Sequence, residues 1–408
     1  MQGVNAAPRA AQSADAINWL IKGAPSITVQ AGAQLVNADL SLGADLSGWL
    51  RTDAPPTVES DSTATIHRSC SVTFDPAQID PLTGESTTLP FNYLSQFVLL
   101  YWTFTNNDTG FAARFNMGIY CLSSPQVDAS QLPNTWTFDG YDLLSLLDVP
   151  IGDTYFVAPS TSIDTAIASL VHAVLPTATI NGSTGLTAGG TGLTWPFDES
   201  DAYTYLDAIN AMLTAGGFLP LWADWNGVFQ ITAATSFASH AIEYVFDTSD
   251  EDNIVAESRS VTNDLSDVPN KWKFIMSGLT AAPVEGQTQY TYTDSRASSP
   301  TSTVNRGRTV WSINYVDTLT QDSTSYAQLV TLAQKQIELD LTTSEEFAVS
   351  TSPFPLAWHF DSITYNDNNI AEALPAQSNT RHVVALSWES TLDGSADTTW
   401  TWQTAVAL

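Results

Sequence analysis

The side chains that could do chemistry are acidic and lie beside tryptophans. Asp198-Glu199 is one adjacent pair, and Asp224 lies between Trp222 and Trp225. A glycoside hydrolase needs two carboxylates across a groove, one as general acid and the other as nucleophile or base. The chain holds 43 acidic residues, so acidic pairs also arise by chance. Because Asp224 lies two residues before Asn226-Gly227, we interpret it as a turn residue and expect no catalytic residues.

The histidines and cysteines form no pattern for metal binding or covalent catalysis. The five histidines are far apart and share no HExxH motif: His67, His172, His240, His359 and His382. The two cysteines, Cys70 and Cys121, are too few for a disulfide framework. We expect two buried thiols rather than a bridge. The sequence therefore predicts no metal site and no cofactor.

The charged residues are few and unevenly distributed. The chain has 43 Asp and Glu against 13 Lys and Arg, a net charge of −30, yet only 14% of its residues are charged. No Lys or Arg occurs in the 144 residues between Arg114 and Arg259, which contain 17 acidic residues. Such a surface repels phosphate, which argues against a nucleic-acid-binding groove. A channel through which DNA passes without sticking is compatible with it.

A central block, residues 136–230, contains most of the expected helices. Apolar residues at helical spacing predict helices over Tyr141–Leu147, Ile163–Leu175 and Asp201–Leu213. We expect Ser200 to cap the third helix and Gly216-Gly217 to end it.

A β-hairpin is expected directly after these helices. Two apolar segments surround Asn226-Gly227 within Phe218–Gln230, which predicts two strands joined by a tight turn. We expect the apolar faces of the helices to be buried against this hairpin. The residues concerned are Ile167, Val171, Ile209 and Leu213.

Strands dominate on both sides of the central block. About six strand-like segments precede it, separated by turn sequences, as in an antiparallel barrel or sandwich. More strands follow it, with one helix expected at Ser325–Leu339. We divide the chain into an N-terminal arm (1–23), a first β domain (24–138), a central α/β domain (139–235) and a second β domain with one helix (236–408). No apolar stretch is long enough for an integral membrane segment, and no secretion signal is evident.

Three short motifs follow one another along the chain. They are Gly140-Tyr141-Asp142, Ile151-Gly152-Asp153-Thr154-Tyr155 and Asp267-Val268-Pro269-Asn270-Lys271-Trp272. Their order resembles that of the minor tail proteins of long, non-contractile-tailed phages of actinobacteria, which are similar to the baseplate hub of other tailed phages. The resemblance extends from Thr63 to Trp402. It is weaker at Asp75–Leu89, which is longer than a turn between barrel strands should be, and the arm has no counterpart.

The resemblance implies an α+β, mainly β fold in which two antiparallel β-barrel-like hub domains flank a small α/β domain. It also implies a structural virion protein, a homotrimer that closes the distal end of the tail tube. The partners implied are the distal tail protein ring, the tape-measure protein and other tail-tip or receptor-binding proteins, with DNA only as transiting cargo. The protein would be located at the tail tip of the virion after assembly in the host cytoplasm.

Two other classes of function stay open at this stage. A carbohydrate-binding or cell-wall-hydrolysing tail-tip protein would use Trp222 and Trp225 as platforms for sugars. A soluble extracellular β-rich enzyme is the other, and the missing signal and disulfides weaken it.

The basic residues are concentrated in the final third of the chain. This group comprises Arg259, Lys271, Lys273, Arg296, Arg306, Arg308 and Lys335. Our hypothesis is that part of it, namely Arg259, Lys271, Arg306 and Arg308, contacts the acidic portion of a neighbouring subunit. The alternative is that these are scattered surface charges worth under about 1 kcal/mol each.

Overall fold

A computed structural model of the protein describes residues 27–404, apart from 80–85, 108–111, 129–133, 190–191, 196–202, 236–239, 249–254, 264–266, 278, 280–281, 317–322, 343–344, 357–359, 368–379 and 395–396. The expected N-terminal arm at 1–23 lies outside the described residues.

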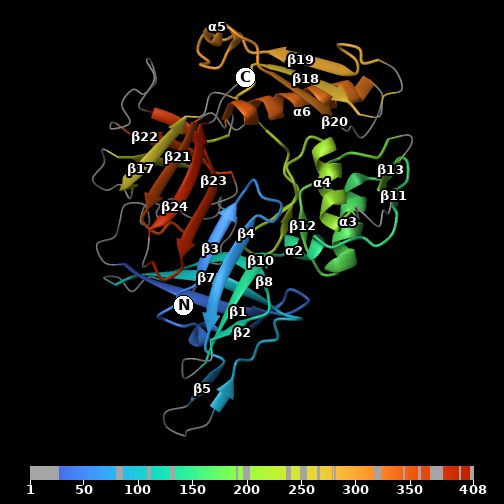
Figure 1. Cartoon of the computed structure of the whole chain (residues 1–408). Coiled ribbons are helices and arrows are strands. Elements are labelled where there is room, and N and C mark those ends of the chain that lie inside the picture. The colour runs from blue at the N-terminus through green and yellow to red at the C-terminus, as the bar shows by residue number, and fades with distance from the viewer. Residues whose placement is uncertain are drawn as a thin grey trace.

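Most strands belong to one 14-stranded sheet (Figure 1). The order along its main path is β17 (Val255–Asn263), β21 (Glu345–Thr351), β24 (Thr398–Thr404), β23 (Thr380–Thr391), β3 (Thr57–Asp61), β4 (Arg68–Phe74), β10 (Thr135–Asp142), β8 (Ala112–Leu122), β7 (Phe97–Asn106), β1 (Ile27–Val36) and β2 (Leu42–Asp45). Beside this path, β9 (Gln126–Asp128) pairs with β10, and β22 (Ser362–Asn366) pairs with β23 and β16 (Tyr244–Asp247). All of these pairs are antiparallel except β16 with β22.

The sheet joins the two β portions of the chain. β3 pairs with β23, with Thr57 opposite Thr391 and Asp61 opposite Ser387. Buried residues of both portions form one apolar cluster, in which Phe74 and Phe138 come from the first portion and Trp400 and Trp402 from the second. The fold is therefore mainly β with large antiparallel sheets. The expected barrel-like closure is not confirmed, because the strand pairing among the described residues forms no closed barrel.

Strand β4 illustrates why these segments form strands. Its residues alternate strictly between buried and half-buried positions from Arg68 to Phe74. This period of two places Cys70, Val72 and Phe74 on the face that contacts the core. The same alternation, visible in the sequence, correctly predicted this strand.

The central part of the chain carries most of its helices (Figure 1), and it forms a second apolar cluster that also includes Val36, Phe97, Leu99 and Ile119 of the large sheet. It contains α2 (Leu144–Leu147), α3 (Ile163–Val174), α4 (Tyr205–Ala215), β11 (Tyr155–Val157), β12 (Ile180–Asn181), β13 (Leu193–Trp195), β14 (Trp222–Ala223) and β15 (Phe229–Gln230). β14 and β15 form the expected antiparallel hairpin, and β12 pairs with β15 in parallel. The helix α3 matches the prediction within one residue. The helix α2 begins three residues later than expected, because Tyr141 and Asp142 are still part of β10.

Helix α4 begins later than the sequence indicated, at Tyr205. Its cap is Thr204, whose hydroxyl accepts a hydrogen bond from the Asp207 amide, while the Asp207 carboxylate accepts one from the Thr204 amide. This reciprocal pair satisfies two amides that an α-helix leaves unpaired at its start. Ser200, the expected cap, lies outside the described residues.

A third unit is inserted between β17 and β21, which pair with each other. It contains β18 (Lys271–Met276), β19 (Gln289–Thr293), β20 (Trp311–Val316), α5 (Thr303–Arg306) and α6 (Ser323–Thr342). In the three-stranded sheet, β18 lies between β19 and β20. One face of α6 presents Leu329, Ala333 and Ile337 to the buried side of this sheet. This helix is the one expected at Ser325–Leu339, extended at both ends.

The long segment Asp75–Leu89 does not form a simple turn. It contains a small antiparallel hairpin of β5 (Ala77–Ile79) and β6 (Ser86–Thr88), which projects from the lower end of the molecule in Figure 1. The remaining element is a short 3-10 helix, Ser47–Trp49. The domain boundaries at residues 138 and 235 stay predictions.

Burial of the central helices generates a prediction about stability. Leu213 is fully buried in the same apolar cluster as Ile167, Ile209 and Phe229 of the hairpin. The substitution Leu213→Ala should lower the free energy of unfolding by about 2–5 kcal/mol, because it leaves a cavity where the side chain was. Chemical denaturation measures the loss. The exposed neighbour in Thr214→Ala is the control and should change stability little; equal stability of both variants would contradict this packing.

Candidate functional site

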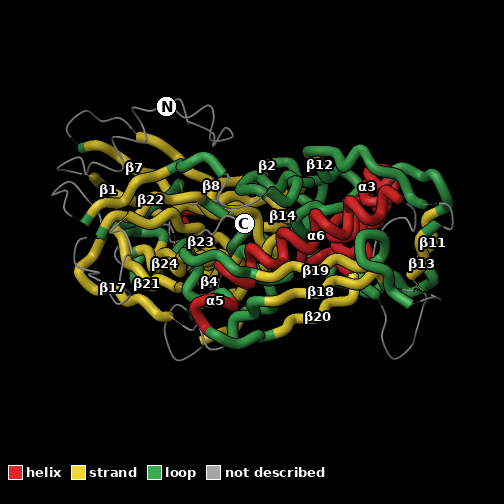
Figure 2. The backbone as a smooth tube through the Cα atoms, turned by 90° about the horizontal axis from the view of Figure 1, so that it is seen from above, coloured by secondary structure: helices red, strands yellow, loops and turns green. Residues whose placement is uncertain are grey.

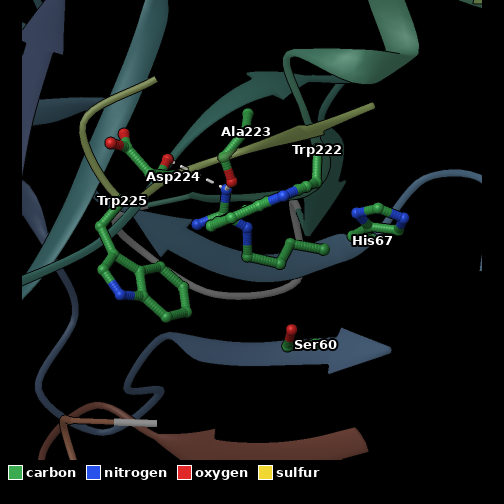
Figure 3. Close-up of a pocket in the computed structure, with 7 residues that line it drawn as sticks. Ser60, His67, Trp222, Ala223, Asp224 and Trp225 are labelled. Atoms are coloured by element: carbon green, nitrogen blue, oxygen red, sulfur yellow. Dashed lines mark hydrogen bonds between the residues drawn. The ribbon is translucent and has the colours of Figure 1, made fainter. Parts of the chain in front are cut away.

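A small, enclosed polar site lies where the central hairpin meets the large sheet. Figure 3 shows Trp222, Ala223, Asp224 and Trp225 on one side, and His67 and Ser60 on the other. Ser60 comes from β3 and His67 directly precedes β4. The site is thus assembled from segments about 150 residues apart in the sequence, and no local motif indicates it.

Arg68 is the centre of this site, and its side chain is only 4% exposed. Its Nη2 donates to the backbone oxygens of Ala223 and Asp224, the latter at 3.0 Å. The guanidinium carbon lies 4.4 Å from the centre of the Trp225 ring. Buried charge is costly unless it is paired and hydrogen-bonded, and the hairpin supplies most of these partners.

Asp142 supplies the opposite charge. Its Oδ2 lies 3.7 Å from Nε of Arg68, and its Oδ1 accepts a hydrogen bond from the amide of Leu144 at the start of α2. Burial raises the pKa of Asp142 to about 6, although Arg68 and the Leu144 amide oppose the change. Asp142 therefore links the large sheet, the first helix and the buried arginine.

This arrangement explains the Gly-Tyr-Asp motif at 140–142. A Cβ atom at Gly140 would lie 2.6 Å from Leu122 Cδ2 and 2.8 Å from Cys70 Sγ, so β10 can approach its neighbours only with glycine there. Tyr141 points outward and is exposed, whereas Asp142 is fully buried. The motif thus combines a close strand approach with a buried carboxylate.

His67 lies beside this ion pair and is also buried. Burial, together with the positive charge of Arg68, lowers the pKa of His67 to about 4, against the opposing effect of Asp61. The imidazole is therefore neutral at physiological pH, which suits a packed residue rather than a general acid.

The space between these residues is too small for a substrate. The cavity measures about 10 Å³, which is at most the room that one water molecule needs. A sugar ring or a peptide cannot enter. The chemistry available at this site is the fixing of the hairpin on the sheet, and we regard the site as structural.

The glycosidase and sugar-platform hypotheses fail at the described residues. The carboxylate of Asp224 accepts hydrogen bonds from the amides of Asn226 and Val228 and from Gln230 Nε2, as expected for a turn residue. Trp222 and Trp225 are only 8% and 7% exposed. A sugar platform requires an exposed ring face, so neither tryptophan can serve as one. Asp198-Glu199 lies outside the described residues.

The tight turn of the hairpin also contacts the sheet. Gly227 has a φ of 76°, a left-handed conformation that favours glycine. A Cβ atom there would lie 2.8 Å from Ile119 Cδ1 and 2.9 Å from Leu143 Cδ1. Asn226, the other turn residue, accepts a hydrogen bond from Asn116 Nδ2 of β8 at 2.7 Å. The Asn-Gly turn therefore fits the large sheet as well as its own two strands.

A second, open hollow of about 270 Å³ lies between the hairpin and the second β portion. Its walls include Trp222 and Thr232 on one side and Phe360 and Asp361 on the other. His240, also at its rim, interacts through Nε2 with the Thr235 hydroxyl at 2.6 Å. The hollow is slightly smaller than most ligand pockets.

The cysteines and acidic residues give no sign of metal or redox chemistry in the described part of the chain. Cys70 and Cys121 are both free thiols; Cys70 is buried, as expected, whereas Cys121 is only half-buried. Partial burial raises the pKa of Cys121 to about 12. No group of three or more His, Cys, Asp and Glu within the described ranges could hold a metal ion. None of the described helices is long and apolar enough to span a membrane.

The residues predicted to form a subunit interface lie in or near the third unit. Arg306 Nη1 donates to the backbone oxygen of Val268 at 2.7 Å, so this guanidinium contacts its own chain. Lys271 Nζ lies 4.5 Å from the centre of the Trp311 ring, while Arg308 is exposed. Arg259 lies in β17, opposite Val349 of β21. Three of the four therefore lie between residues 271 and 308, and no described contact tests their role.

The Asp-Val-Pro-Asn-Lys-Trp motif holds the third unit together. The side-chain Nδ2 of the fully buried Asn270 donates to the backbone oxygens of Thr301 and Arg308, and its Oδ1 accepts from the backbone amide of Val310. Trp272 Nε1 donates to Asp340 Oδ2 of α6 at 2.7 Å. The motif fixes the entry of β20 and the position of α6.

The fold is that of phage tail proteins. No family model matches the chain, and no curated protein matches it. Among solved structures, the tail protein from Neisseria meningitidis MC58 aligns with a TM-score of 0.57 at 11% identity, over 92% of this chain and 96% of that one. The 43 kDa tail protein of prophage MuSo2 from Shewanella oneidensis aligns with a TM-score of 0.55 at 12% identity, over 91% of this chain and 98% of that one. Prophage tail protein gp18 from Listeria monocytogenes EGD-e aligns with a TM-score of 0.52 at 10% identity, over 91% of this chain and 94% of that one. The resemblance to tail proteins from phages of actinobacteria in particular stays a prediction.

The buried ion pair generates a second stability prediction. In Arg68→Met, Asp142 would be left buried without its cation, which should lower the free energy of unfolding by about 3–5 kcal/mol at neutral pH. The matched control is Arg51→Met, which removes an ion pair with the mostly exposed Asp53 and should cost under about 1 kcal/mol.

The same variant should show a characteristic pH dependence. Arg68 lowers the pKa of both Asp142 and His67. Without Arg68 the native state of the variant binds protons more readily than the native state of the parent does, so the destabilisation should shrink as the pH falls from about 7 to about 5. Denaturation curves across that range measure it. A loss of stability that is equal at about pH 7 and about pH 5 would show that Arg68 does not affect the protonation of Asp142 and His67.

Proposed function

We propose that this chain is a structural virion protein of a phage tail: a homotrimeric hub at the tail tip that closes the distal end of the tail tube. Its partners in this proposal are the distal tail protein ring, the end of the tape-measure protein and host-recognition proteins. It would assemble in the host cytoplasm and open for the passage of DNA.

One observation carries this proposal. The fold aligns with three phage or prophage tail proteins over more than nine-tenths of this chain and of each of those chains. An alignment of this extent includes the central helices and the third unit as well as the large sheet. The continuous sheet that joins the two β portions also suits two side-by-side hub domains, each barrel-like in the assembled ring.

The charge of the chain supports a tube through which DNA passes. With a net charge of −30 per chain, three copies around a channel would repel the phosphate backbone instead of binding it. The subunit contacts in such a ring must be apolar or use the few basic residues. Of the predicted contact we keep Arg259, Arg306 and Arg308, of which Arg308 is exposed.

Assembly is the direct test of the hub. We expect light scattering to give a mass three times the 44.0 kDa of one chain. Arg308→Glu should weaken the trimer by about 1 kcal/mol per contact at low salt, and added salt should weaken the parent trimer. Arg308→Lys, which keeps the charge, is the control. A chain that stays monomeric at every concentration would contradict the hub, whereas a trimer indifferent to both salt and Arg308→Glu would remove only Arg308 from the contact.

The absence of enzymatic activity is a separate prediction. We expect the purified chain to release no reducing sugar from cell walls and not to clear a peptidoglycan suspension, because Asp224 is engaged in its turn and Trp222 and Trp225 are buried. Lysozyme is the positive control. Hydrolysis by the parent chain that disappears in Asp224→Asn would favour the alternative, a carbohydrate-binding or cell-wall-hydrolysing tail-tip protein.

A further inference from the structure

The sheet of the third unit has one face that α6 does not cover. On the covered face, Trp272, Phe274 and Met276 of β18 pack with α6. Side chains alternate along a strand, so the intervening residues point to the other face. There, β20 exposes Trp311 at 47%, Ile313 at 57% and Tyr315 at 73%. Three large apolar side chains in a row on one strand are unusual for a surface.

The same strand has an open edge. β20 pairs with β18, and no described strand pairs with its other side. Figure 2 shows β20 along the border of the molecule, separated from β19 by β18. Natural sheets protect such edges with prolines, lysines or bulges. The sequence of β20, Trp-Ser-Ile-Asn-Tyr-Val, contains neither a proline nor a charge, and its register with β18 is regular over six pairs.

Two lysines give this surface a positive charge in an otherwise acidic protein. Lys271 pairs with Trp311, and Lys273 pairs with Ile313. Their Nζ atoms lie 4.5 and 5.7 Å from the centre of the Trp311 ring, so both ammonium groups lie over β20. Glu285 interacts with Lys273, but its carboxylate also accepts hydrogen bonds from Gln289 and Thr291. The lysines lie on β18, and their ammonium groups reach the Trp311 ring of β20, the strand that carries the open edge.

We propose that β20 binds an extended, acidic segment of a different protein, which adds to the sheet as a fourth strand. The open edge would supply backbone hydrogen bonds, the row of apolar side chains would bury part of the added strand, and Lys271 and Lys273 would pair with its carboxylates. This surface goes beyond the proposed function and does not depend on assembly of the hub. Lys271, which the sequence analysis assigned to a subunit contact, belongs to this surface instead.

The charges favour a different protein over a second copy of this chain. If two copies paired through their β20 edges around a two-fold axis, the lysines of both would lie on one continuous sheet, and like charges would face one another. An acidic segment reverses the sign of that interaction.

The test uses the full chain and a capped synthetic peptide of about ten residues that alternates glutamate with valine. We expect titration calorimetry to detect binding at low salt that weakens as salt is added, and hydrogen exchange to show slower exchange of the amides of β20 when the peptide is present. A peptide that alternates lysine with valine should bind at least about tenfold more weakly.

Two variants separate charge from edge pairing. In Lys271→Glu with Lys273→Glu, the preference between the two peptides should reverse. In Ile313→Lys, at an exposed position, the added charge should protect the edge and reduce binding of a neutral threonine–valine peptide by about tenfold. Both variants should keep the circular dichroism spectrum and the mass of the parent, which makes the result independent of the hub proposal.

Three results would overturn the proposal. The first is that neither the glutamate–valine nor the lysine–valine peptide binds. The second is that a peptide binds but the amides of β20 do not exchange more slowly. The third is that, without peptide, the amides of β20 exchange more slowly and the mass rises as the protein concentration is increased. That result would identify a second copy as the occupant.

Discussion

The pairing of β3 with β23 is the constraint on which the rest of the architecture depends. It joins residues 57–61 to residues 387–391, so the first and last described portions of the chain form one sheet. Closing such a long loop costs conformational entropy, which the shared core of Phe74, Phe138, Trp400 and Trp402 offsets. Every described α-helix lies in the central part between β10 and β16 or in the unit between β17 and β21.

Arg68 shows how an insertion is fixed to the sheet. The chain has only 13 basic residues, and one of them is buried where the hairpin meets β4. Its contacts with Asp142, Trp225 and the oxygens of residues 223 and 224 make the junction polar and directional. An apolar contact alone would allow the hairpin to slide. For a protein proposed to close the end of a tail tube, a fixed angle between these parts is a useful property.

The proposed hub also gives the charge distribution a common explanation. Acidic residues predominate over most of the chain, which suits a channel for DNA, while the positive charges of the third unit gather beside exposed apolar side chains. In a ring of subunits, surfaces for neighbouring copies and surfaces for other tail proteins must differ, or the subunits would associate in the wrong way. Arg308 and the β20 edge are two distinct candidates for these roles.

The sequence by itself determined the local elements. Helical spacing predicted α3 and α6, alternation predicted β4, and Asn226-Gly227 predicted the hairpin, because each of these signals is contained within a few turns of chain. Asp224 was also correctly assigned to a turn from its neighbours alone. Tertiary structure alone decided that Trp222 and Trp225 are buried rather than exposed, that β3 pairs with β23, and that Arg68 and Asp142 meet. These contacts join residues far apart in the sequence, and neither periodicity nor turn chemistry encodes which distant strand becomes a neighbour.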